Sequence, residues 1–156
     1  MRKQNHFQIV MVLFLLDIVE GHGQEEDHSI TYSNKKSRQI GSYKVKVKAP
    51  KAGHGSYTLT YTIKPPKVTG VKLRSPKSRQ MEVSYAKKSG GVYYQIRYRV
   101  KGTSSWRKTT AKGTYKLLKN LKAGKSYQVE VRAFKKVSGV TYYGDWSTAK
   151  TFTVKK

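Results

Sequence analysis

The chain has 156 residues and carries 33 lysines and arginines against 8 aspartates and glutamates, a formal charge of +25. Its length allows one domain or one and a half. A hydrophobic fraction of 37%, with 12% aromatic residues, excludes a solvated disordered tail and predicts a modest core. Cysteine is absent, which excludes disulfides, thiolate metal sites and a cysteine nucleophile.

The N-terminal segment differs in charge from the rest of the chain. Residues 1–27 hold two basic and five acidic residues, whereas residues 28–156 hold 31 basic and three acidic ones, a balance of +28. Two basic residues followed by the apolar run 9–16 are typical of a secretory signal peptide, and the run is too short for a usual membrane span. Because acidic residues follow directly, a non-native start is the alternative. Residues 1–27 are therefore predicted to be signal-like or non-native.

From about residue 29 apolar and polar residues alternate, which is the pattern of half-buried strands. Three strands are predicted before Pro65-Pro66, around residues 29–33, 43–49 and 57–63. Three strands are fewer than the roughly seven of a complete sandwich. The extended, donor-poor pair at 65–66 is the predicted domain boundary.

The first strands resemble part of a known module. Residues 29–34, 41–47 and 55–58 are similar to the C-terminal half of a bacterial immunoglobulin-like surface module. The resemblance implies that residues 28–64 form a partial immunoglobulin-like segment of three strands.

Residues 67–156 predict an all-β domain of their own. Seven strand-like runs, with turn residues between them and no helical periodicity, indicate a β-sandwich. The predicted strands are 68–73, 81–85, 94–100, 106–110, 115–118, 127–133 and 148–154, and a loop is expected over 138–145.

These ninety residues resemble a fibronectin type III domain of a bacterial cell-surface or secreted protein. The likeness rests on the proline-led run 66–71, on 94–98, on the block 121–133 that holds Leu121 and Gly124, and on 144–147. It implies that Tyr127 forms a tyrosine corner, whose hydroxyl bonds to main chain between the fifth and sixth strands. Tyr85 stands where the family often has tryptophan, which implies a smaller, more polar core centre. No Arg-Gly-Asp occurs, so integrin binding in the familiar mode is not implied.

Catalysis is not predicted. Residues 67–156 contain no histidine or cysteine and only three acidic residues, which removes the usual bases for a nucleophile. Glu82 and Glu130 alternate with core positions, so both are expected to point to solvent from opposite sheets, too far apart for glycoside hydrolysis. Histidines 6, 22, 28 and 54 lack ligand spacing, so no metal or cofactor is expected.

Two surfaces are candidate binding sites. The first is the outer face of the third and sixth strands, where Arg97 and Arg99 are expected beside Arg132, with Glu130 between them and Phe134 at the end. The second is a loop with Tyr142, Tyr143 and Trp146, whose rings could stack on sugars, bases or a partner protein. The alternatives are that the charges protect the sheet from aggregation and that the rings complete the core.

The positive charge predicts non-specific attraction to polyanions. Specific recognition of nucleic acid is not predicted, because Tyr94 and Tyr98 fall on the opposite face of the strand from Arg97 and Arg99, so rings and charges do not line one groove. The leading hypothesis is a non-catalytic, secreted or cell-surface module that acts as a spacer or adhesion unit toward anionic wall polymers, glycans or proteins. One alternative is an accessory domain from a larger glycan-degrading enzyme. The other is a basic protein that binds nucleic acid non-specifically.

Overall fold

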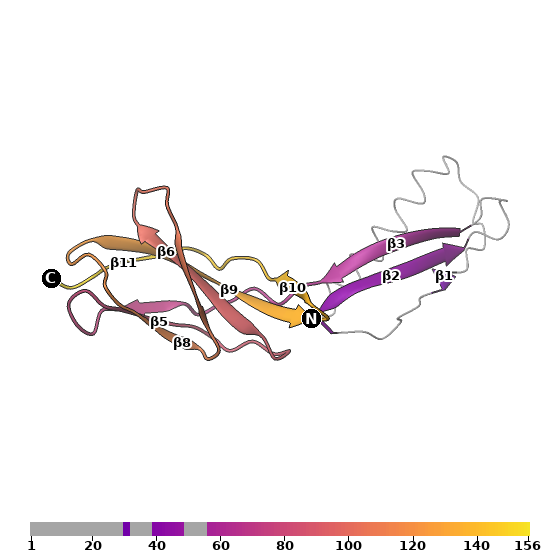
Figure 1. Ribbon diagram of the computed structural model, residues 1–156, viewed down its shortest axis with the longest axis horizontal. Helices are drawn as coiled ribbons and strands as arrows, with labels where there is room; N and C mark the ends of the chain where they lie inside the picture. Colours follow the sequence, from indigo (N-terminus) through magenta and orange to yellow (C-terminus); the bar gives the residue numbers. More distant parts are fainter. Residues whose placement is uncertain (1–29, 32–38, 49–55) are drawn as a thin grey trace. The chain divides into compact units, whose positions relative to one another are not determined.

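A computed structural model of the chain describes residues 30–31, 39–48 and 56–156 (Figure 1). The predicted signal-like segment and all four histidines lie outside the described residues. By its internal contacts the chain divides into two compact units, one of residues 1–32 and 46–58 and one of residues 33–45 and 59–156. The two prolines of the predicted boundary belong to the second unit.

The first sheet contains the three strands that the alternation predicts. They are β1 (Ile30–Thr31), β2 (Gly41–Lys48) and β3 (Ser56–Ile63), in the order β1-β2-β3. Tyr43 of β2 and Tyr61 of β3 stack with ring centroids 5.4 Å apart. Aromatic pairs across neighbouring strands stabilise a sheet by about 0.2–1 kcal/mol.

The remaining strands form two further sheets that enclose one core (Figure 1). The smaller has the order β4-β5-β8, and consists of β4 (Lys72–Arg74), β5 (Met81–Ser84) and β8 (Tyr115–Leu118). The larger has the order β10-β9-β6-β7, with β11 also on β9; its strands are β6 (Tyr93–Val100), β7 (Arg107–Ala111), β9 (Ser126–Val137), β10 (Val140–Tyr143) and β11 (Lys150–Thr153). No helix occurs in the ranges described above, and the all-β prediction is confirmed.

The edge strand beside β9 comes in two pieces, and the loop predicted over 138–145 is wrong in part. β10 pairs with the end of β9, and β11 pairs with its beginning. Ser138 and Gly139 both have positive φ, 47° and 83°, as a two-residue turn of type I′ requires. The Ser-Gly pair therefore makes a tight hairpin instead of opening a long loop.

Alternating side chains of both sheets fill the core, together with Val68, Leu121 and Val154 from the connecting segments. The largest fully buried side chains are Tyr94, Met81, Ile96, Leu121, Val68, Val83, Val129, Val131 and Val154. Each buried aliphatic side chain contributes about 1.5–3 kcal/mol. Tyr85 lies beside Tyr94 with ring centroids 4.7 Å apart, and its hydroxyl donates to the Gly113 carbonyl at 3.0 Å. Burial, with a smaller contribution from Tyr94, raises the pKa of Tyr85 above its ordinary value.

The predicted tyrosine corner is present. The Lys122 main-chain N–H donates to the buried Tyr127 hydroxyl at 2.9 Å, which ties the β8–β9 loop to β9. Leu121 of the same loop is almost fully buried. Gly124 takes a φ of 67°, which favours glycine, and its N–H donates to the Val154 carbonyl at 3.0 Å.

Candidate functional site

The outer face of the larger sheet carries three arginines opposite three oxygen-bearing side chains. The antiparallel register of β6 and β9 pairs Gln95 with Arg132, Arg97 with Glu130, and Arg99 with Gln128. Residues directly opposite on one face of a sheet are close enough to bond. Strand parity and register therefore supply every arginine of this face with an acceptor.

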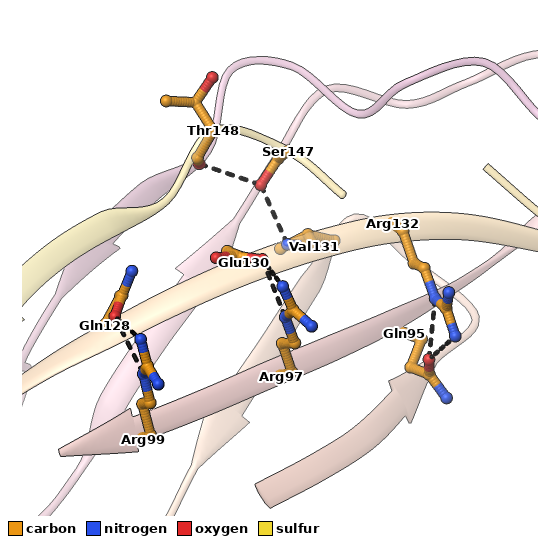
Figure 2. Close-up of polar contacts among 9 residues, drawn as sticks. All are labelled: Gln95, Arg97, Arg99, Gln128, Glu130, Val131, Arg132, Ser147 and Thr148. Atoms are coloured by element: carbon orange, nitrogen blue, oxygen red, sulfur yellow. Dashed lines mark hydrogen bonds and ion pairs between the residues drawn. The ribbon is translucent and has the colours of Figure 1, made fainter. Parts of the chain in front are cut away.

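Each guanidinium donates two hydrogen bonds to one oxygen (Figure 2). Arg97 binds Glu130 Oε2 through Nε at 2.8 Å and Nη2 at 2.5 Å. The corresponding distances are 3.0 and 2.8 Å from Arg99 to Gln128, and 2.9 and 2.7 Å from Arg132 to Gln95. Bonds in which one partner is ionised are stronger than neutral ones, so these pairs fasten β6 to β9.

Aromatic rings lie between the arginines. The ring centroid of Trp106 lies 4.5 Å from the guanidinium carbon of Arg97 and 4.3 Å from that of Arg99. Trp146 is 4.3 Å from both the Arg97 and the Arg132 guanidinium, and Tyr143 is 3.8 Å from Arg132. All these distances are within the range of cation–π attraction. We call this stack the arginine ladder; in order it comprises Tyr143, Arg132, Trp146, Arg97, Trp106 and Arg99.

Ser147 holds Trp146 in place. Its main-chain N–H donates to the Val131 carbonyl at 2.8 Å, and its hydroxyl accepts from the Val131 N–H at 3.0 Å (Figure 2). The same hydroxyl donates to the Thr148 carbonyl at 3.1 Å. Between β10 and β11 no edge strand pairs with β9, so the Val131 N–H has no main-chain acceptor there and bonds the Ser147 hydroxyl instead. These bonds fix Ser147 on β9 and thereby hold the ring of Trp146, the preceding residue, over the sheet.

The ladder is partly removed from water, and this changes one prediction. Glu130 lies on the outer side as parity requires, but it is only 8% exposed, so the expectation that it points to solvent is wrong. The same expectation fails for Glu82 on the smaller sheet, whose side chain is 14% exposed. The ion pair of Glu130 with Arg97, whose side chain is 26% exposed, offsets the cost of burial. Burial, with a smaller effect of Arg97, lowers the pKa of Arg132, although Tyr143 opposes the shift. Arg132 nevertheless stays charged at neutral pH.

The two surfaces predicted separately are largely one. Tyr143 and Trp146 lie on Arg132, next to Arg97. Tyr142 is half-buried and packs against the core, and both tyrosines belong to β10 instead of a loop. Arg99 completes the ladder at its other end.

Sequence reasoning missed three members of this face, namely Trp106, Gln95 and Gln128. The strand register brings them here: β7 pairs Arg107 with Tyr98, so the preceding residue falls beside Arg99. The pairing of β6 with β9 likewise places Gln95 opposite Arg132 and Gln128 opposite Arg99, which alternation within a single strand does not show.

Chemically the ladder binds its own parts together. It has no nucleophile, and in the described ranges no group of three or more acidic or histidine side chains could hold a metal ion. Within the same residues no helix is long and apolar enough to cross a membrane. The exposed surface beside the ladder is aromatic: Tyr93 is 44% and Tyr143 38% exposed, on either side of Phe134 at ring distances of 5.8 and 5.7 Å.

Solved structures share this fold. One titled as a myokine structure is 18% identical with a TM-score of 0.51, covering 59% of this chain and 99% of that one. The FN1–FN3 domains of chicken CNTN1 are 24% identical with a TM-score of 0.54, covering 78% of this chain and 45% of theirs. The fold is fibronectin type III-like. No family model and no curated protein matches the sequence.

Proposed function

We propose that the chain is a non-catalytic spacer or binding module of a secreted or cell-surface protein, and that it attaches to anionic polymers by charge. The observation that carries the proposal is the charge balance of residues 67–156, 23 lysines and arginines against three acidic residues. Two of these acids are already paired, Glu82 with Arg74 and Glu130 with Arg97. Most of the positive charge is therefore left to attract a polyanion.

The arrangement of the carboxylates supports a non-catalytic role. Glu82 lies on β5 of the smaller sheet and Glu130 on β9 of the larger, so the two are on opposite layers of the sandwich. Each is bound to an arginine, so the two carboxylates do not flank a common site as the pair in a glycoside hydrolase does. Fibronectin type III-like folds are typically non-catalytic.

The test is binding to an immobilised polyanion at several salt concentrations. We expect retention at low salt and a steep, log-linear loss of affinity as salt rises, because binding releases counterions from the polymer. Neutral dextran serves as the control and should not bind. Failure to bind any polyanion at low salt would contradict the proposal.

A second candidate, a carbohydrate-associated accessory domain, is favoured by the row Tyr93, Phe134 and Tyr143. The three rings come from adjacent strands, and the outer two are exposed, as sugar stacking requires. Binding to a neutral glycan array that is lost in Tyr143→Ala and kept in Tyr115→Ala would favour this function. Tyr115 is a suitable control because it is half exposed and lies on the smaller sheet.

A further inference from the structure

Four segments meet at the end of the sandwich where the chain finishes. They are the turn 75–80, the turn 101–105, the loop 119–125 and the C-terminal residues 154–156. Figure 1 shows the C-terminus beside the loops that precede β5 and β9, at the left of the view. We call these four segments the basic end.

Main-chain hydrogen bonds hold the segments of the basic end together. The Leu121 N–H donates to the Arg79 carbonyl at 3.0 Å, which joins the first turn to the long loop. The Val154 N–H donates to the Lys125 carbonyl at 3.0 Å, and the Lys155 N–H donates to the Ser75 hydroxyl at 3.1 Å. The Lys101 N–H donates to the Ser126 carbonyl at 2.9 Å. The charges on these segments are therefore carried by an ordered framework.

The basic end concentrates positive charge with no acidic side chain to offset it. It contains no aspartate or glutamate. It contains eight exposed cationic residues: Lys77, Arg79, Lys101, Lys119, Lys122, Lys125, Lys155 and Lys156. In the part of the chain that the structure describes, none of these side chains makes a hydrogen bond or an ion pair. The contrast with the arginines of the ladder is complete, because each of those has an acceptor.

We propose that the basic end is the site that binds an acidic polysaccharide. The inference rests on the proposed function and assigns it a surface. Eight like charges on one rigid end repel each other, and a polymer with regularly spaced sulfates or carboxylates removes that repulsion while releasing counterions. Charge complementarity therefore selects the class of ligand.

The composition of the basic end favours a polysaccharide over a nucleic acid. The four segments contain no aromatic residue, so they offer no surface on which bases could stack. Seven of the eight cations are lysines, which act as point charges and lack the planar fork with which arginine reads guanine. Such a surface suits repeated, flexible anionic groups.

The experiment compares two triple variants of the full chain with equal net charge. Lys119, Lys122 and Lys125 are changed to Gln at the basic end, and Lys87, Lys112 and Lys136 are changed to Gln in the control. The control lysines are also exposed, but they follow β5, β7 and the Tyr93-paired part of β9, at the opposite end of the sandwich. Heparin is the probe, titrated calorimetrically from 50 to 300 mM salt, and thermal melting checks that both variants are folded.

We expect the basic-end variant to lose about tenfold or more in heparin affinity and to show a shallower salt slope by about two to three. The control should lose less than threefold. Equal losses in both variants would overturn the assigned site while leaving the proposed function intact. No heparin binding by the unaltered chain would overturn the proposed function itself. Tighter binding to duplex DNA than to heparin at the same salt would overturn the polysaccharide as occupant.

Discussion

The arginine ladder and the basic end lie on one domain and use their cations in opposite ways. In the ladder each guanidinium bonds an amide or carboxylate oxygen and lies against at least one aromatic ring. At the basic end the exposed lysines and Arg79 have no acid in the same segments. A high content of basic residues therefore has two separate physical consequences, stability on one surface and attraction to polyanions on another.

The difference follows from position in the sheet. The arginines of the ladder stand on two paired strands, where register places a partner about 5 Å away. Residues of the basic end stand on turns, whose side chains have no cross-strand neighbour and extend into solvent. Arginine suits the first setting because it can bond and stack at once, and lysine suits the second because it stays hydrated.

Removing a ring should have the largest effect on stability. Trp146→Ala deletes the ring shared by Arg97 and Arg132, and we expect a loss of about 2–3 kcal/mol in the free energy of unfolding, from lost burial and two cation–π contacts. Urea denaturation measures it. Tyr115→Ala, half exposed on the smaller sheet, is the control and should cost less than about 0.5 kcal/mol. Equal costs would mean that the ladder contributes nothing special.

Neutralising a carboxylate should distinguish the Arg97–Glu130 pair, in which both side chains are shielded, from the Arg74–Glu82 pair, in which the arginine is exposed. Glu130→Gln keeps the shape of the side chain but leaves the partly buried Arg97 without its counter-charge, so we expect a loss of about 1–2 kcal/mol. Glu82→Gln is the matched control: the Glu82 side chain is 14% exposed, but its partner Arg74 is 70% exposed and is solvated without the counter-charge. Its unfolding midpoint should hardly change. A larger effect at Glu82 than at Glu130 would contradict the account.

Alkaline pH should weaken the core through Tyr85. Burial raises the pKa of Tyr85, so the folded state retains a proton that the unfolded chain releases near pH 10. Its contribution is thus fully present below pH 10 and is lost as the pH rises further, by about 1 kcal/mol at pH 11. Stability curves of the unaltered chain and Tyr85→Phe should converge above pH 10. Parallel curves would contradict this assignment.

The smallest change in stability is expected at Arg79, which has a φ of 58° although it is not glycine. Arg79→Gly suits that backbone conformation, so stability should stay level or rise by up to about 1 kcal/mol. Heparin affinity should fall, because one cation of the basic end is gone. At this residue the free energy of unfolding and the heparin affinity are therefore expected to change in opposite directions, or only the affinity to change. A fall in stability with unchanged affinity would reverse the roles we assign to the two regions.

Alternation predicted the sandwich well because a strand with one buried face repeats every two residues. Tyr94, Ile96 and Tyr98 are buried as their parity requires, and the hydroxyl of Tyr127 is bonded to main chain as the family resemblance implies. β10, the first piece of the edge strand, was missed because the Ser138-Gly139 pair is typical of a loop, whereas its two positive φ angles make a hairpin.

The site was harder to predict because it depends on which strands are neighbours. Parity placed Arg97, Arg99, Arg132 and Glu130 on one face but could not show that Gln95 and Gln128 face two of the arginines. Trp146 and Trp106 come from segments 40 residues apart in the sequence and share the guanidinium of Arg97. The basic end likewise arises from four separate segments that only the folded chain brings together.

The most direct test of the central claim is a heparin titration followed by ¹⁵N-edited NMR of the full chain. The account predicts progressive shifts of the amide signals of residues 75–80, 101–105, 119–125 and 154–156, while the indole N–H signals of Trp106 and Trp146 stay in place. Early shifts of the two indole signals, with the amides of the basic end unmoved, would contradict it.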